Sequence, residues 1–169
     1  MNSQQIKEIL LSEIHEVSIN YEKYCNDPKR DFSRKRKLPF ELMLKNIIGM
    51  GSKSITNELI DIFQASSEMP SASAFVQQRT KIRPEALKAV FDGFMSRILA
   101  SADKMRILAV DGSDIQIETN PKDKTSHIST SIDKKSFNLL HLNALYDLEE
   151  HVYTDAIIQA AKSQNEHGS

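Results

Sequence analysis

The sequence has little of what several common kinds of site depend on. It contains a single cysteine, Cys25, which excludes an internal disulfide and a metal site built from cysteines. The formal net charge is only -1, so any charge used in binding must be local. No apolar run is long enough to cross a bilayer. The polar start, Met1 to Gln5, lacks a signal-peptide pattern, so we expect a cytoplasmic protein with no membrane partner.

Motifs for several reaction classes are also absent. Serine-nucleophile, Walker and dinucleotide-binding glycine patterns do not occur. The five histidines have no ligand spacing and are better explained as surface or strand residues. What is present is an ordinary soluble composition, with 40% hydrophobic and 27% charged residues. At 169 residues the chain allows one ordinary domain or two small ones.

Apolar residues in the first hundred positions recur at steps of three and four, which is typical of amphipathic helices. Pro28 should end the first of these helices, and Ser71 should cap a later one. We therefore predict a helical domain over residues 1–100. Its expected helices are 3–24, 38 to about 49, 55–63, 72 to about 81, and 84 to about 99.

The densest positive patch of the chain is the segment 29–37. Its last four residues are Arg34, Lys35, Arg36 and Lys37. Such side chains neutralise phosphates and release counterions, which adds affinity for nucleic acid. A solvated loop is the plain alternative, and both interpretations stay open. Phe32 is a candidate hydrophobic anchor within this loop.

Two short helices joined by a turn are predicted over residues 55–81, and the second carries polar residues that can donate hydrogen bonds. This is typical of a helix-turn-helix unit, whose second helix reads DNA. Glutamine and arginine can contact base edges or phosphates. A small bundle with a polar outer face gives the same pattern, so this alternative stays open. The candidate DNA contacts are Ser73, Gln77, Gln78 and Arg79.

The hydrophobic period changes from helical to extended near residues 101–104, where we place a domain boundary. The extended runs that follow are 106–115, 137–146 and 152–159. Three such strands in succession predict an antiparallel meander, with a polar loop or ragged hairpin arm between the first two. The chain is therefore expected to be α+β. The second domain should span residues 101–162, and a polar tail should follow at 163–169.

The apolar run of the first predicted strand ends at Asp111. A buried strand that emerges at a polar edge has this pattern, and a carboxylate held there is a candidate metal ligand. The plain alternative is an Asp-Gly turn. Asp114 would face the other side of a strand, so the two carboxylates are not expected to bind one ion together. Hard cations such as Mg²⁺ or Mn²⁺ need two or more carboxylates at one point, and Asp111 has no evident partner.

Four short segments occur in order along the chain. They are Arg36–Phe40, Pro70–Arg79 with Lys81–Ile82, Leu108–Ser113, and Leu142–Asp147. Together they resemble DDE transposases of the insertion-sequence-four family, over most of the chain from about Arg34 to Gln159. The resemblance implies a helical N-terminal domain that binds transposon ends, followed by a ribonuclease-H-like catalytic domain that uses Mg²⁺ or Mn²⁺. Asp111 matches the first Asp of the family's Asp-Asp-Glu triad, which sits at the end of the first strand. It is therefore the expected catalytic and metal-binding residue.

The sequence departs from the family because the second Asp and the Glu have no counterpart. The chain therefore resembles the N-terminal portion of a transposase, with the first three antiparallel strands of an incomplete ribonuclease-H-like domain. We expect it to bind double-stranded DNA and not to catalyse strand transfer alone. A second copy, or the full-length transposase, is a candidate partner. Two alternatives stay open: an inactive DNA-binding or dimerising module that inhibits transposition, and an α+β interaction protein with no nucleic-acid role.

Overall fold

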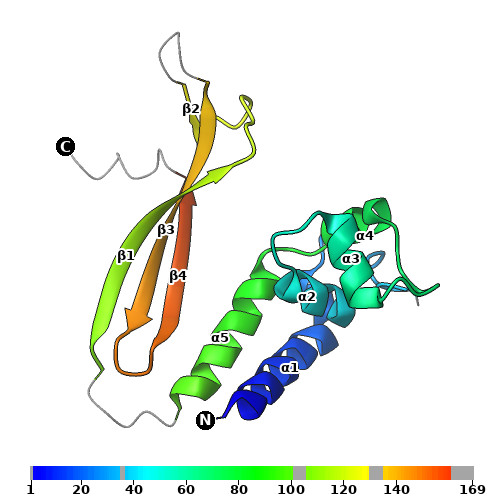
Figure 1. The fold of residues 1–169 in the computed structure, drawn as a ribbon, viewed down its shortest axis with the longest axis horizontal. Coiled ribbons are helices and arrows are strands. Elements are labelled where there is room, and N and C mark those ends of the chain that lie inside the picture. Colours follow the sequence, from blue (N-terminus) through cyan, green and yellow to red (C-terminus); the bar gives the residue numbers. More distant parts are fainter. Residues whose placement is uncertain (1, 35–36, 101–105, 130–134, 161–169) are drawn as a thin grey trace. The chain divides into compact units, whose positions relative to one another are not determined.

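The chain divides into two compact units, a helical unit, Met1–Ala102, and a sheet unit, Asp103–Ser169. The computed structural model describes residues 2–34, 37–100, 106–129 and 135–160. The expected tail, residues 163–169, lies outside this description. The α+β composition that the sequence predicted is confirmed, with helices in the first unit and an antiparallel sheet in the second (Figure 1).

The helical unit follows the predicted order of helices. They are α1 (Ser3–Ile19), η1 (Tyr21–Tyr24), α2 (Phe40–Gly49), α3 (Ile55–Phe63), α4 (Ala72–Arg79) and α5 (Glu85–Leu99). The prediction of one helix over residues 3–24 is wrong, because α1 ends at Ile19 and the short 3-10 helix η1 follows. Asn20 explains the break. Its side chain donates to the carbonyl of Glu16 at 3.3 Å, and such local bonds compete with helix continuation.

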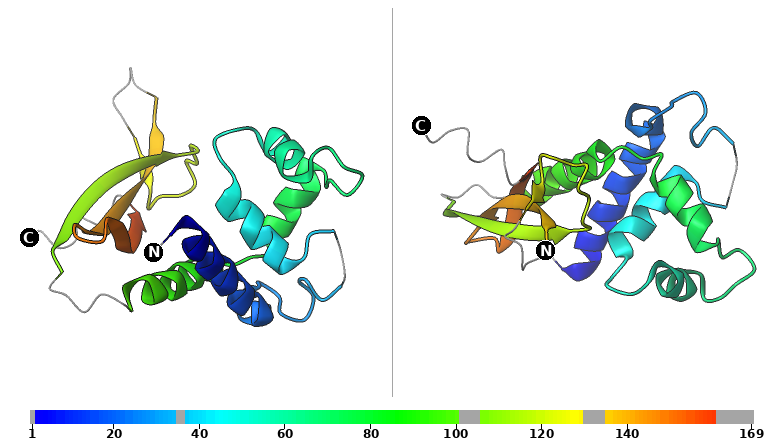
Figure 2. Two further views of the ribbon diagram at one scale, coloured as in Figure 1. Left: turned by 60° about the horizontal axis from the view of Figure 1, so that its bottom comes forward. Right: turned by 90° about the horizontal axis from the view of Figure 1, so that it is seen from above.

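Helices α1 and α5 lie side by side and run antiparallel (Figures 1 and 2). Ile14 and Val17 of α1 are buried in one core cluster with Val90 of α5. The period of three and four in the sequence predicted this stripe. A second cluster, around Leu59 and Phe75, joins α3 to α4. The helical unit therefore has a core of its own.

The sheet unit is built around β3 (Phe137–Asp147). On one side β3 pairs with β1 (Leu108–Ile117), and on the other with β4 (Val152–Ala160). The short β2 (His127–Ile128) pairs with the start of β3. The antiparallel arrangement of three consecutive long strands is confirmed. The prediction that the first strand is buried is wrong, because nearly every residue of β1 is exposed, and in the described part of the chain β1 pairs only with β3.

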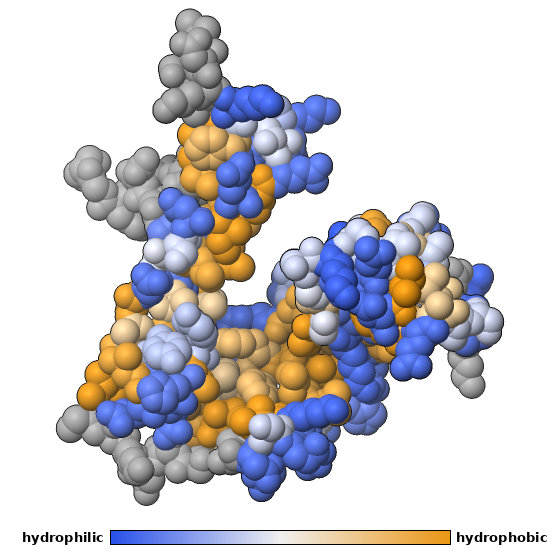
Figure 3. All heavy atoms as spheres, in the orientation of Figure 1, coloured by the Kyte–Doolittle hydropathy of each residue, from blue (hydrophilic) through white to orange (hydrophobic). Residues whose placement is uncertain are grey.

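Each face of the sheet can be read from the strand register, because residues directly opposite in an antiparallel pair share a face. Ser113, Leu142 and Ile158 share one face, together with the flanking Leu140 and Ala144. Figure 3 shows hydrophobic side chains running along the strands of this unit. The sheet therefore carries apolar surface of the kind that usually packs on another element.

Buried polar side chains hold the turns of the sheet unit. Asp147 is fully buried and accepts from Nε of Arg106 and from the backbone N–H groups of Glu149 and Glu150. Asn138 is also fully buried. Its side chain accepts from the N–H of Asn120 at 2.8 Å and donates to Asn120's carbonyl at 3.1 Å and to Ser126 Oγ at 2.8 Å. In the segment expected to be a loop or ragged arm, residues 118–128 therefore form a compact turn that ends in β2.

Candidate nucleic-acid interface

The cationic loop between η1 and α2 is built on a turn at Asp27. The backbone N–H groups of Arg30 and Asp31 donate to the carbonyl of Asp27 at 3.1 and 2.8 Å. Phe32 has a positive φ of 56°, and its ring packs edge-on against Phe40 of α2 with 5.2 Å between ring centroids. Phe32 therefore anchors the loop, as the sequence predicted, while the described cations of the loop stay exposed.

Two of the four predicted phosphate contacts, Arg34 and Lys37, are described and exposed. Lys35 and Arg36 lie outside the described residues. Nζ of Lys37 donates to the carbonyl of Ser67 at 2.7 Å and lies 3.7 Å from the Glu68 carboxylate. The end of the basic run is thereby tied to the connection between α3 and α4, next to the predicted recognition helix.

The predicted contacts on α4 do not share one face. Ser71 caps this helix, and Phe75 turns into the core, where it is fully buried. Ser73 and Gln77 are one turn apart and exposed, and Nε2 of Gln77 donates to Ser73 Oγ at 3.3 Å. Arg79 is also exposed, but two helical positions beyond Gln77 amount to about 200° of rotation. A surface that meets Ser73 and Gln77 therefore does not meet Arg79.

The connection between α3 and α4 runs from Gln64 to Ser71, longer than the three or four residues of a helix-turn-helix turn. Gln64 and Ala65 both have left-handed backbone conformations, with φ of 49° and 52°. Helix α4 itself ends at Arg79, close to the predicted end at about residue 81. The two helices pack through Leu59 and Phe75, but the connection departs from the helix-turn-helix pattern that the sequence suggested.

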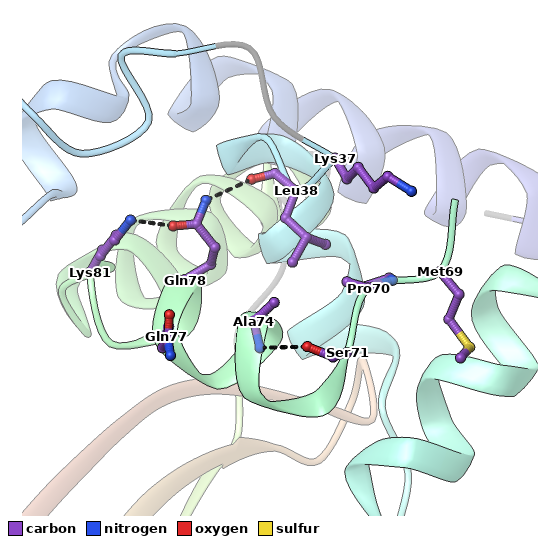
Figure 4. Close-up of a pocket in the computed structure, with 9 residues that line it drawn as sticks. All are labelled: Lys37, Leu38, Met69, Pro70, Ser71, Ala74, Gln77, Gln78 and Lys81. Atoms are coloured by element: carbon purple, nitrogen blue, oxygen red, sulfur yellow. Dashed lines mark hydrogen bonds between the residues drawn. The ribbon is translucent and has the colours of Figure 1, made fainter. Parts of the chain in front are cut away.

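Gln78 lies inside the protein, where 7% of its surface is exposed. Its Nε2 donates to the carbonyl of Leu38 at 3.4 Å, and its Oε1 accepts from Nζ of Lys81 (Figure 4). The amide of this predicted DNA contact is therefore engaged within the chain. It joins the end of the basic loop to the segment that follows α4.

A cavity of about 540 Å³ opens between the end of the basic loop and α4 (Figure 4). Leu38, Met69 and Ala74 give it apolar walls. Two lysines and one exposed glutamine, Lys37, Lys81 and Gln77, also line this cavity. Two segments far apart in the sequence, 37–38 and 69–81, thus combine cationic, amide and apolar side chains around one cavity. Contacts with phosphates and base edges require this combination.

Arg34 lines a neighbouring cavity of about 460 Å³, together with Lys29, Arg30 and Lys81. None of these last three was predicted as a contact. Lys29 and Arg30 belong to the basic run and could have been included on charge alone. Lys81 follows α4, and no sequence pattern indicates that it meets a loop some fifty residues earlier.

Cys25 lies near the basic loop but does not line either cavity. It is buried and forms an isolated β-bridge with Ile82. Burial raises the pKa of the Cys25 thiol to about 11, and the charges of Asp31 and Glu22 act in the same direction, against that of Lys81. The thiol is therefore protonated near neutral pH and is a poor nucleophile.

Asp111 lies in the sheet unit, as the fourth residue of β1. The predicted extended run 106–115 is close to the observed strand, which continues to Ile117 while it pairs with β3. Asp111 therefore lies within β1 and not at its end, which is where the family resemblance placed it. Directly across the sheet, Asp111 faces Ala144 of β3, which in turn faces Ala156 of β4. Its cross-strand neighbours therefore supply no second carboxylate.

Two other carboxylates of the sheet unit, those of Asp114 and Asp147, do not lie beside Asp111. Asp114 is on the opposite face from Asp111 and lies 2.9 Å from Nδ1 of His141. Asp147 is fully buried and holds Arg106 and the turn to β4. Among the described residues there is no group of three His, Cys, Asp or Glu side chains that could hold a metal ion. The residues around Asp111 thus do not fit a divalent-metal site, which needs several oxygen ligands at one point.

Fold and site together define an α+β protein whose helical unit carries two adjoining cation-lined cavities. Comparison with protein-family models, with curated proteins and with solved structures finds no match. In the described part of the chain, none of the helices is both long and apolar enough to span a membrane.

Proposed function

We propose that this chain is the N-terminal portion of a DDE transposase of the insertion-sequence-four type, and that its helical unit binds double-stranded DNA at transposon ends. The observation that carries the proposal is the surface shared by Lys37, Gln77 and Lys81 around one cavity. The ammonium groups would contact phosphates, and the exposed amide of Gln77 would reach base edges. Ser73, bonded to Gln77, belongs to the same face.

The order of elements supports the family proposal. A helical unit precedes an antiparallel sheet, and the first strand of that sheet carries Asp111. We propose that this sheet is the beginning of a ribonuclease-H-like domain. The strand pairing β1-β3-β4 is what the first three long strands of such a domain would form.

Catalysis is proposed for the complete transposase and not for this chain. In the complete enzyme Asp111 would be one of the carboxylates that hold Mg²⁺ or Mn²⁺. In the part of the chain described, its cross-strand neighbours are alanines, so a metal site is not assembled from these residues.

A second candidate function follows from the presence of a DNA-binding surface without an assembled metal site. A unit with a cationic DNA surface and an incomplete carboxylate set would occupy transposon ends without cutting them. It would then act as an inhibitor of transposition, alone, as a homodimer or paired with the full-length transposase. Co-purification of the chain with full-length transposase, and loss of strand transfer as the chain is added, would favour this function.

Selection from a random-sequence duplex pool tests the proposed function, because it does not require the end sequence in advance. We expect the purified chain to enrich a defined motif, with affinity that falls steeply as salt rises. A charge-matched non-target such as a short acidic peptide serves as the negative control. Absence of any duplex binding at low salt would contradict both transposase-derived functions and favour a protein-interaction role.

A further inference from the structure

The cavity of about 460 Å³ that adjoins the cavity lined by Lys37, Gln77 and Lys81 brings four cations together. They are Lys29, Arg30 and Arg34 from the loop and Lys81 from the segment after α4. All three loop cations are exposed at the surface. Among the ion pairs formed within the described ranges, none involves any of the four.

The two acidic residues of the cavity are occupied by the loop itself. Oδ2 of Asp31 accepts from the backbone N–H of Asp27 at 2.9 Å. Oδ1 of Asp27 accepts from the backbone N–H of Lys29 at 3.2 Å. These carboxylates shape the turn, and four cations against two carboxylates leave the cavity with an excess of positive charge.

Lys81 is fixed from two sides. The backbone N–H of Asn26 donates to the carbonyl of Lys81 at 3.0 Å, and the Asn26 side chain donates to the carbonyl of Thr80 at 2.7 Å. Nζ of Lys81 donates to Oε1 of Gln78. An ammonium group has three donors, so this bond leaves donors for a ligand in either of the cavities that Lys81 lines.

We infer that this second cavity binds a backbone phosphate of duplex DNA, with Lys81 and Arg30 as its principal contacts. The inference deepens the proposed function and rests on it. The planar guanidinium of Arg30 can donate two parallel hydrogen bonds to phosphate oxygens, and Lys81 supplies a point charge beside it. Because Lys81 also lines the cavity that holds Gln77, a phosphate seated here would fix the position of α4 on the duplex.

The test is the salt dependence of binding to a fluorescent random-sequence duplex, measured by anisotropy for the full chain. Lys81→Gln and Arg30→Gln are compared with Lys7→Gln, which removes the same charge from an exposed position on α1 outside both cavities. Each cavity variant should lower the slope of log K against log salt by about one and weaken binding roughly tenfold at about 0.1 M salt. Lys81→Arg should restore the slope, and far-ultraviolet circular dichroism should show that every variant is folded.

The outcomes separate the two proposals. If the unmodified chain binds duplex DNA but both cavity variants keep the slope and affinity of Lys7→Gln, the phosphate site is wrong and Lys81 is not a DNA contact, while duplex binding by the helical unit stands. If the unmodified chain binds no duplex at any salt concentration, the proposed function fails and the phosphate site with it. A lower slope in both cavity variants, with the Lys7 control unchanged, supports the site.

Discussion

Gly93 of α5 lies so close to the carboxylate of Glu13 on α1 that a methyl group at position 93 would clash with it. To make room, the buried Glu13 carboxylate would have to shift and give up its ion pair with Nε of Arg97. The close contact between α1 and α5 therefore depends on the absence of a side chain at Gly93. Glycine is unfavourable inside a helix, and close packing is the reason it is accommodated here.

Gly93→Ala should destabilise the helical unit. The overpacking cost of about 1–3 kcal/mol should exceed the gain of about 1 kcal/mol from alanine's helix propensity. Gly49→Ala is the matched control, because nothing lies within 4 Å of a methyl group at that helical position. Urea unfolding followed by circular dichroism should give a lower free energy of unfolding for the first variant and an unchanged or higher one for the second. Equal effects would show that the contact with Glu13 is unimportant.

The sheet unit should lose stability in acid through Asp147. The hydrogen bond from Arg106, helped by the backbone N–H of Glu150, holds the pKa of the Asp147 carboxyl below its usual value of 3.8. Since the folded pKa is below the unfolded one, this stabilisation is complete above the unfolded pKa. It is lost as pH falls through the folded pKa. Hydrogen exchange of β3 amides between pH 6 and 2 should therefore show a loss of protection that Asp147→Asn reduces.

A control is needed because Asp123 acts in the same direction. Bonds from Ser126 and Thr125 lower the pKa of Asp123 to about 2, so part of the acid sensitivity should remain in the Asp147 variant. Glu118→Gln, at an exposed position of the same unit, should leave the acid profile unchanged. Identical profiles for Asp147→Asn and Glu118→Gln would contradict the role of Asp147.

Adjacent glutamines on α4 should respond differently to substitution. Gln77→Ala should change the motif selected from a duplex pool and alter the free energy of unfolding by less than about 0.5 kcal/mol, because the side chain is exposed. Gln78→Ala should cost about 1–3 kcal/mol, because it removes the donor to the Leu38 carbonyl and the acceptor for Lys81. Chemical denaturation measures the loss of stability in both variants, and motif selection measures the change in DNA preference. A larger loss of stability for Gln77→Ala than for Gln78→Ala would contradict the assignment of Gln78 as the buried residue.

Removing Asp111 should change neither DNA affinity nor metal affinity of this chain. Its opposite neighbours across the sheet are Ala144 and Ala156, which offer no ligand atoms in their side chains. Calorimetric titration with Mn²⁺ should give the same weak isotherm for the unmodified chain and for Asp111→Ala. Metal-dependent cleavage of a duplex by this chain, lost in the Asp111 variant, would overturn the proposal that it is inactive alone.

The local sequence pattern predicted structure correctly wherever that structure depends on residues close together in the sequence. The apolar period predicted the face of α1 that buries Ile14 and Val17, and Ser71 caps α4 as its residue type indicated. Three successive extended runs also predicted the meander of β1, β3 and β4. Periodicity failed at Asn20, where a side chain bonded to the backbone ends α1. It also failed to predict the exposure of β1, because the continuous apolar run before Asp111 indicated a buried strand.

Sequence alone thus determined the two-part α+β organisation, the basic run and the candidate carboxylate. Tertiary structure decided which of these groups meet. The bond from Asn26 to the Lys81 carbonyl brings a lysine after α4 to the loop that carries Arg30. Packing also turned Gln78 inward while Gln77 stayed exposed. Helical rotation fixes the angle between neighbouring residues, but which side becomes the interior depends on the elements that pack against it.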